Sequence, residues 1–183
     1  MKKNIKVLLN KLRGIQSIEK LKKRGLKIGE NVTIMGGVII DPSHCWHIEI
    51  GSDVIIAPNV HILAHDASTK IFFGHTRVAN VKIGNRVFIG AGTIILPGVT
   101  VGDDVVIGAG SVVKKDILPN AVVVGNPAKI ICSLDEYIQK QNEKMNDENT
   151  FDESFTLRNP NFSEEQRIQM FETCDKQGAL FVE

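Results

Sequence analysis

The chain has 183 residues, of which 43% are hydrophobic and only 5% aromatic, and its formal net charge is +1. This length supports one domain with a substantial core plus terminal attachments. No apolar run is long enough to span a membrane, and the start lacks the apolar core of a secretory signal. We therefore expect a cytoplasmic protein without stable membrane insertion and without a nucleic-acid partner.

The first 27 residues predict a basic, helical N-terminal segment. They carry ten Lys or Arg side chains against one acid, Glu19. Apolar residues recur at helical spacing in this segment, at Ile5, Leu8, Leu9, Leu12, Ile15 and Ile18. Because residues 133–183 carry twelve acids against five bases, we expect the two ends to pack on each other or on a neighbouring subunit. Contact of the basic start with an anionic membrane surface is the less favoured alternative.

The middle of the chain contains aliphatic residues at a strict interval of six, namely Ile83, Ile89, Ile95, Val101, Ile107 and Val113. The fifth position of each unit is also small or β-branched: Val87, Thr93, Val99, Val105 and Ser111. A helix would scatter these positions around its surface, and glycine, asparagine and proline interrupt any continuous strand. The pattern therefore predicts a coil of short strands and turns, with one flat face per six residues.

The same interval occurs upstream, at Ile28, Ile34 and Ile40 and again at Ile50, Ile56 and Ile62. Ten residues separate Ile40 from Ile50, and twenty-one separate Ile62 from Ile83. The coil is thus expected to be interrupted around 41–49 and around 64–82. Interruptions of a repeat form loops, and loops commonly carry function.

This repeat resembles that of the hexapeptide-repeat transferases, in which three hexapeptides form one eighteen-residue turn of a left-handed parallel β-helix. The resemblance covers roughly residues 28–131. It implies a mainly β, single-stranded left-handed parallel β-helix as the catalytic domain, with loop 64–82, and the handedness comes from the resemblance alone. It also implies a homotrimer with three active sites at subunit boundaries.

An eighteen-residue turn would stack Gly90-Ala91-Gly92 on Gly108-Ala109-Gly110. Small residues leave a groove that an extended ligand can approach closely, although they are equally expected where a turn is merely tight. In the acetyltransferases that this chain resembles, the pantetheine arm of coenzyme A lies along such a corner. The cofactor-binding residues implied are Ala91, Gly92, Ala109 and Gly110, with Lys114, Lys115 and Lys129 near the phosphates. A position that is often basic in these relatives is Cys132 here.

All five histidines lie within residues 44–75. The segment Ile56–Asp66, with the loop after it, is similar to galactoside, maltose and polysaccharide O-acetyltransferases, which implies that His65 is the general base. A neutral imidazole can take the proton of an attacking hydroxyl group. We expect Asp66, or a backbone carbonyl, to orient His65.

The sequence predicts two further roles. The N–H of Ala91 or Gly92 is expected to stabilise the oxyanion. From their position in the loop, His75 and Asn80 are expected to line the acceptor side of the pocket.

These residues predict direct transfer of an acetyl group from acetyl-CoA to a hydroxyl of a sugar or surface-polysaccharide precursor, without a metal. One alternative is N-acetylation of an amino sugar. Another is a γ-type zinc carbonic anhydrase that uses His61, His65 and either His44 or His47. The third is a non-catalytic scaffold, and a sugar nucleotidyltransferase is disfavoured because no nucleotide-binding domain fits before residue 28.

Residues 132–183 predict an acidic, helical C-terminal extension. Capping-box patterns at Ser133–Glu136 and Ser163–Gln166 predict the starts of two helices. The polar, aperiodic stretch 145–162 is expected to be an extended arm. The three cysteines, Cys45, Cys132 and Cys174, have no C-x-x-C spacing and are expected to be reduced thiols.

Overall fold

The structure, a computed structural model, describes residues 17–183. The chain forms two compact units, Met1–Leu134 and Asp135–Glu183. Of the basic segment, the helix α2 (Ile18–Lys23) is described, and the predicted helical positions from Ile5 to Ile15 lie outside the described residues. No helix within 17–183 has the length and apolar character needed to cross a membrane.

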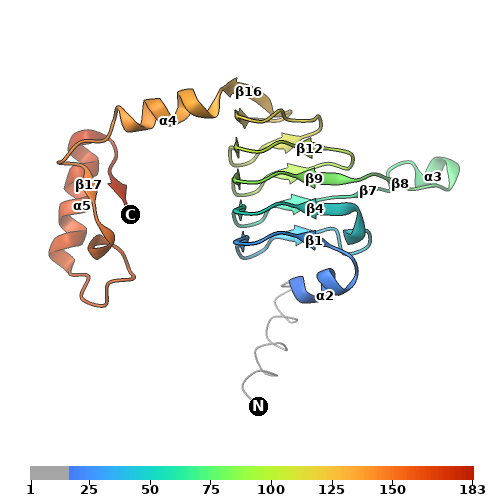
Figure 1. Ribbon diagram of the computed structural model, residues 1–183, viewed down its shortest axis with the longest axis horizontal. Helices are drawn as coiled ribbons and strands as arrows, with labels where there is room; N and C mark the ends of the chain where they lie inside the picture. The colour runs from blue at the N-terminus through green and yellow to red at the C-terminus, as the bar shows by residue number, and fades with distance from the viewer. Residues whose placement is uncertain (1–16) are drawn as a thin grey trace, which may run out of the picture. The chain divides into compact units, whose positions relative to one another are not determined.

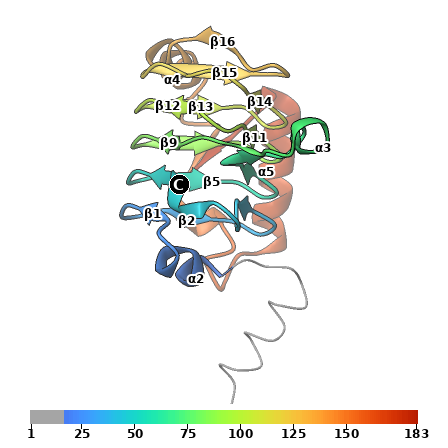
Figure 2. The ribbon, with the colours of Figure 1, turned by 90° about the vertical axis from the view of Figure 1, so that its right-hand side faces the viewer.

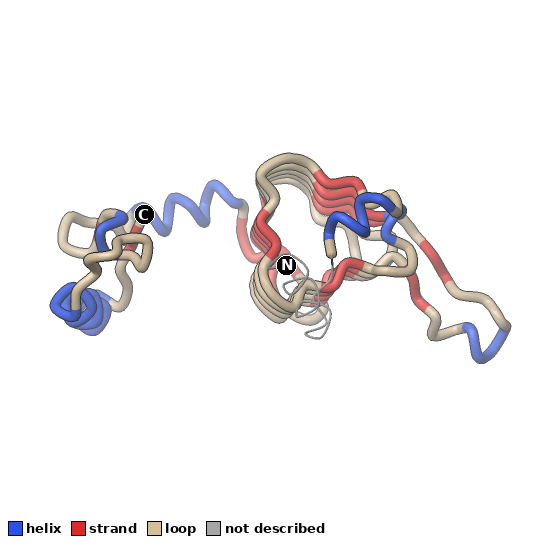
Figure 3. The backbone as a smooth tube through the Cα atoms, turned by 90° about the horizontal axis from the view of Figure 1, so that it is seen from below, coloured by secondary structure: helices blue, strands red, loops and turns tan. Residues whose placement is uncertain are grey.

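The first unit is a three-sided coil whose faces are sheets of parallel strands (Figures 1 and 3). Each of the first four turns of the coil contributes one short strand to each sheet. The first sheet contains β1 (Lys27–Ile28), β4 (Ile48–Ile50), β9 (Val81–Ile83) and β12 (Thr100–Val101). The second contains β2 (Thr33–Ile34), β5 (Ile55–Ile56), β10 (Val87–Ile89), β13 (Val105–Ile107), β15 (Ala121–Val124) and β16 (Lys129–Cys132). The third contains β3 (Ile39–Ile40), β6 (His61–Ile62), β11 (Ile94–Ile95) and β14 (Val112–Val113).

The six-residue interval marks the side chains that point into the coil. Ile89, Ile95 and Ile107 are completely buried, and Val113 is nearly so. Their counterparts upstream, Ile40, Ile50, Ile56 and Ile62, belong to the same core. Because the interior is narrow, it is filled by branched aliphatic side chains stacked rung on rung, which explains the low aromatic content of the sequence.

Strand pairing places the interruptions where the sequence predicts them. Val87 pairs with Val105, eighteen residues on, which is one regular turn. Ile56 pairs with Ile89, a separation of thirty-three, so the second interruption adds fifteen residues. Ile34 pairs with Ile56, a separation of twenty-two, so the first interruption adds four.

The first interruption is a short turn, and the second is a hairpin that leaves the coil. The turn carries the 3₁₀ helix η1 (Cys45–His47), with Cys45 fully buried. The hairpin consists of β7 (His65–Asp66) and β8 (Arg77–Val78), which are antiparallel, with the helix α3 (Lys70–Phe73) near its tip. Figure 3 shows the hairpin projecting from one corner of the coil.

Both ends of the coil are closed by a change of structure (Figure 2). At the first rung, Leu21 of α2 and Leu26 are buried in the common core. At the last rung, β16 runs antiparallel to β15, whereas the other strand pairs of the three sheets are parallel.

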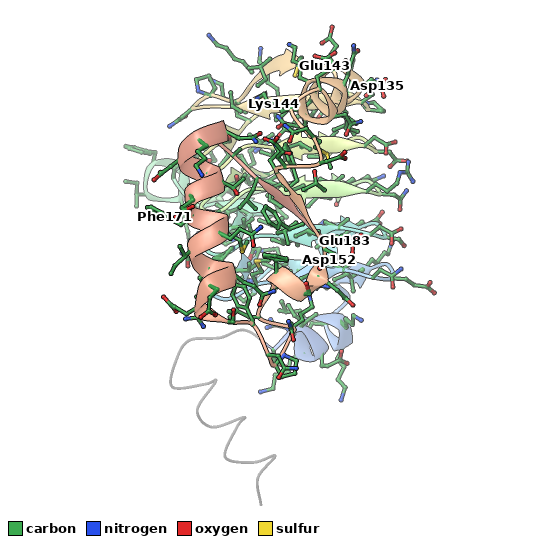
Figure 4. The ribbon with its side chains drawn as sticks, turned by 90° about the vertical axis from the view of Figure 1, so that its left-hand side faces the viewer. Asp135, Glu143, Lys144, Asp152, Phe171 and Glu183 are labelled. Carbon is green, nitrogen blue, oxygen red and sulfur yellow. The ribbon has the colours of Figure 1, made fainter. Side chains whose placement is uncertain are left out.

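The second unit is small and has a modest interior. It contains α4 (Leu134–Asn142), β17 (Thr150–Phe151), the 3₁₀ helix η2 (Glu153–Phe155), α5 (Glu164–Gln177) and β18 (Phe181–Val182). The predicted capping box is present at the start of α5, where Ser163 and Gln166 bond reciprocally. The stretch 145–162 is not a plain extended arm, because β17 pairs in parallel with β18 and Phe151 is buried. Phe171, labelled in Figure 4, lies on the exposed side of α5.

Candidate active site

His65 and Asp41 meet at one corner of the coil. Asp41 directly follows β3 and His65 comes shortly after β6, and these two strands are neighbours, with Ile40 opposite Ile62. The backbone N–H of Asp41 donates to the Ile62 carbonyl at 2.8 Å, which continues the ladder past the ends of the strands. Two residues 24 apart in sequence are thereby placed side by side.

The Asp41 carboxylate is completely buried and accepts several hydrogen bonds. Its Oδ1 accepts from the backbone N–H groups of Ser43 at 2.9 Å and His44 at 3.1 Å. Its Oδ2 accepts from the Ala64 N–H at 3.0 Å and lies against Nδ1 of His65. The first interruption therefore folds around the Asp41 carboxylate. The same carboxylate links this interruption to the segment that carries His65.

These contacts determine the charge of Asp41. Burial raises the pKa of the carboxyl group, but the hydrogen bond from His65, those from Ala64 and Ser43, and the charge of His65 outweigh it. The pKa of Asp41 consequently lies below its usual value, and the group is an anion at neutral pH.

An anionic carboxylate fixes the tautomer of His65, because it can only accept hydrogen bonds. Nδ1 of His65 must therefore carry the hydrogen, and in the neutral imidazole the basic lone pair is on Nε2, at the opposite edge of the ring. The side chain of His65 remains 32% exposed. An oriented and accessible imidazole of this kind is suited to accept a proton from a bound hydroxyl group.

His65 lines a cavity of about 410 Å³. The wall also includes Lys114, predicted as a cofactor ligand, and Arg77, which the sequence reasoning did not select. Arg77 Nη1 donates to the Pro97 carbonyl at 3.1 Å, so its guanidinium lies across the base of the hairpin. The cavity thus combines one imidazole with two cationic side chains and the carboxylate of Asp66.

The small-residue corner is formed as predicted by an eighteen-residue stack. The Gly110 N–H donates to the Ala91 carbonyl at 2.8 Å, and a Cβ on Gly90 would lie 2.5 Å from the Ala109 nitrogen. Gly92 and Gly110 are exposed, each with φ of +69°, and nothing lies within 4 Å of where a Cβ would be. This corner has no side-chain obstruction on two successive rungs.

The positive φ angles alone do not explain why these two positions are glycine. The preceding rung has Asn59 at the position below Gly92, with φ of +60°. Asparagine tolerates this left-handed conformation, so the corner can accept a side chain. The absence of one at Gly92 and Gly110 instead leaves room for a ligand.

The small corner and His65 belong to different corners of the same chain. Gly92 precedes the third-sheet strand β11, whereas His65 and Lys114 follow third-sheet strands. One face of the coil, four to five extended residues or roughly 15 Å, separates them. A site that uses both groups within one chain would have to span this face.

The expected roles of two other groups need correction. The carboxylate that orients His65 is Asp41 and not Asp66, which is exposed and accepts from the Ser68 N–H at 2.8 Å. The Gly92 N–H donates to the Pro58 carbonyl at 2.9 Å, so of the two proposed oxyanion donors only the Ala91 N–H is left.

His75 and Asn80, the predicted acceptor-side residues, lie at opposite ends of the hairpin. His75 lies near the tip of the hairpin, where its ring contacts the Phe73 carbonyl at 2.7 Å. Asn80 is at the base, where its Oδ1 lies 2.7 Å from Nδ1 of His47. Lys115 and Lys129 are exposed, Lys129 in the antiparallel strand β16.

Among residues 17–183, one group of three side chains is close enough together to hold a metal ion, namely Asp41, His44 and His65, whose ligand atoms lie within 4.8 Å of one another. His61, the shared ligand of the carbonic anhydrase alternative, is outside this group.

Comparisons with known proteins agree with this architecture. The sequence profile described as bacterial transferase hexapeptide (six repeats) matches residues 80–115. Protein CapG of Staphylococcus aureus is 41% identical over 143 residues, which are 74% of this chain and 81% of CapG. Galactoside O-acetyltransferase of Escherichia coli K12 is 42% identical over 97 residues, but the chain spans less than half (46%) of that relative.

Among solved structures, a galactoside acetyltransferase in complex with coenzyme A matches with a TM-score of 0.54 and 32% identity. The match covers 65% of this chain and 70% of that one. The repeat, the three parallel sheets and these relatives together show that the chain belongs to the hexapeptide-repeat transferases.

Proposed function

We propose that the protein transfers an acetyl group from acetyl-CoA to a hydroxyl group of a sugar or surface-polysaccharide precursor, with His65 as the general base. The observation that carries the proposal is the hydrogen bond between buried Asp41 and Nδ1 of His65, on the wall of a cavity. The coenzyme A complex of a relative and the O-acetyltransferases among the relatives support the choice of reaction.

In the proposed reaction, Nε2 of His65 takes the proton of the acceptor hydroxyl while its oxygen attacks the thioester carbon. The carbonyl oxygen becomes an oxyanion, which the Ala91 N–H stabilises. The intermediate then collapses, the carbon–sulfur bond breaks, and the leaving thiolate receives the proton from His65. No covalent enzyme intermediate is needed.

We infer a homotrimer wound from left-handed coils, as the family resemblance implies. The separation of the small corner from His65 supports assembly, because a neighbouring copy would have to supply one of the two. In the trimer, Ala91, Gly92, Ala109 and Gly110 of one chain would bind the pantetheine arm. The neighbouring chain would supply both His65 and Lys114, which line one cavity, with Lys114 near the phosphates.

A thiol-release assay with acetyl-CoA and a panel of sugars tests the reaction. We expect His65→Ala to lower kcat by about 10³-fold, within the range for loss of a general base, with acetyl-CoA binding retained. His61→Ala is the matched control and should remain active. A parent protein that released no thiol with any sugar but carried stoichiometric zinc, lost in both variants, would favour the carbonic anhydrase alternative.

Gly110→Asn tests the cofactor groove. Asparagine tolerates φ near +60°, as Asn59 does on its own rung, so the melting temperature should change little. Its side chain would enter the open corner, and we expect the KM for acetyl-CoA to rise about tenfold or more. An unchanged KM would reject this corner as the cofactor site.

A further inference from the structure

The first interruption also presents an aromatic surface beside His65. Trp46, the only tryptophan of the protein, lies in η1 and is 48% exposed. Its indole is 5.5 Å from the ring of His44, and His44 is 4.9 Å from the ring of His65, measured between centroids. Two ring-to-ring steps therefore connect the exposed indole with the proposed base.

The turn holds Trp46 outward. Cys45 is fully buried, and its Sγ lies 3.7 Å from the Leu21 carbonyl and 3.8 Å from that of Arg24. The backbone of Gly25 is so close that a Cβ there would lie 2.8 Å from the Cβ of Trp46. The inward cysteine and the close glycine constrain the backbone here, so the fold directs the Cα–Cβ bond of Trp46 outward.

Polar side chains surround this apolar ring. His47 lies 5.8 Å from the indole centroid and contacts Asn80 at 2.7 Å. A large apolar ring placed among imidazoles and an amide matches a ligand that has both an apolar face and hydroxyl groups. A pyranose ring has this character, because its axial C–H bonds form an apolar face and its hydroxyl groups project around the rim.

We propose that Trp46 is the stacking platform for the acceptor and that the acceptor is a pyranose. The ring stacks on the indole, and the hydroxyl group to be acetylated reaches across His44 to Nε2 of His65. Trp46 thereby selects a cyclic sugar over an open-chain polyol. This inference rests on the proposed acetyl transfer and names its substrate class.

Kinetics of three variants test the platform. With a methyl pyranoside that supports thiol release, we expect Trp46→Ala to raise the acceptor KM about tenfold, with kcat and the KM for acetyl-CoA within threefold of the parent. Trp46→Phe should restore most of the affinity, whereas Trp46→Leu, apolar but without a flat ring, should not. Phe171→Ala in the second unit is the control for loss of an exposed aromatic side chain.

The single tryptophan also permits a test that needs no turnover. Methyl β-D-galactopyranoside should change the Trp46 emission in a saturable way, and galactitol, the open-chain counterpart of galactose, should not. If no sugar releases thiol while the pyranoside still changes the emission, the acetyl-transfer proposal fails and the platform stands. Normal acceptor KM in Trp46→Ala, or an equal response to galactitol, would overturn the platform.

Discussion

The two interruptions of the coil differ in length and in how they are held. The shorter one adds four residues and turns back into the core, with Asp41 and Cys45 completely buried. The longer one adds fifteen residues and ends in Ile71, Phe72 and Phe73, which are 84%, 80% and 60% exposed. The buried carboxylate therefore comes from the short insertion, whereas the long insertion carries His65 at its base and exposes its apolar tip. Length alone is a poor guide to which loop holds the catalytic group in place.

Among substitutions that test how the two insertions differ, Asp41→Asn should have the largest effect on activity and stability. The amide cannot accept as strongly from the backbone donors and from His65, and the tautomer of His65 is no longer fixed. We expect kcat to fall about 10²-fold or more and the free energy of unfolding to fall by about 3 kcal/mol. Thiol release and denaturant unfolding measure the two effects. Asp66→Asn is the matched control; if it were equally damaging, the two carboxylates would not differ as the structure indicates.

The stabilisation by the Asp41 carboxylate should depend on pH. Because the pKa of Asp41 is below its usual value, the unfolded chain binds the proton at higher pH than the folded one. The stabilisation by Asp41 is therefore complete above the ordinary aspartate pKa of about 3.9, and it disappears as the pH falls through the folded-state pKa. The difference in melting temperature between the parent and Asp41→Asn should be largest near neutrality and shrink below about pH 4. A constant difference would contradict this assignment.

The hairpin tip should show the smallest effect on stability. Replacing Ile71, Phe72 and Phe73 together by serine removes little buried surface, so the free energy of unfolding should change by less than about 0.5 kcal/mol per residue. Differential scanning calorimetry checks this. A large loss would mean that the tip packs against another surface, and size-exclusion chromatography would show whether that surface belongs to a second copy.

The sequence predicted the rungs and both interruptions because a narrow core admits only one kind of side chain at a fixed interval. It did not identify Asp41, which lies far from His65 in the chain. The signal was present, since aligning Ile40 with Ile62 places Asp41 next to Leu63, two residues before His65. The strand order would also have allowed the prediction that the small residues and His65 lie at different corners of the coil. The roles of Asp66 and of the Gly92 N–H were not, because they depend on where individual donors and acceptors find partners.

The closed ends of the coil have a further consequence. A stack of parallel rungs presents unpaired N–H and C=O groups at its first and last turns, and such edges can template the addition of another molecule. At the last turn the antiparallel strand β16 covers β15, and at the first turn Leu21 of α2 covers the apolar interior. Without these two coverings, the same repeat would be a segment suited to end-to-end growth into a fibre.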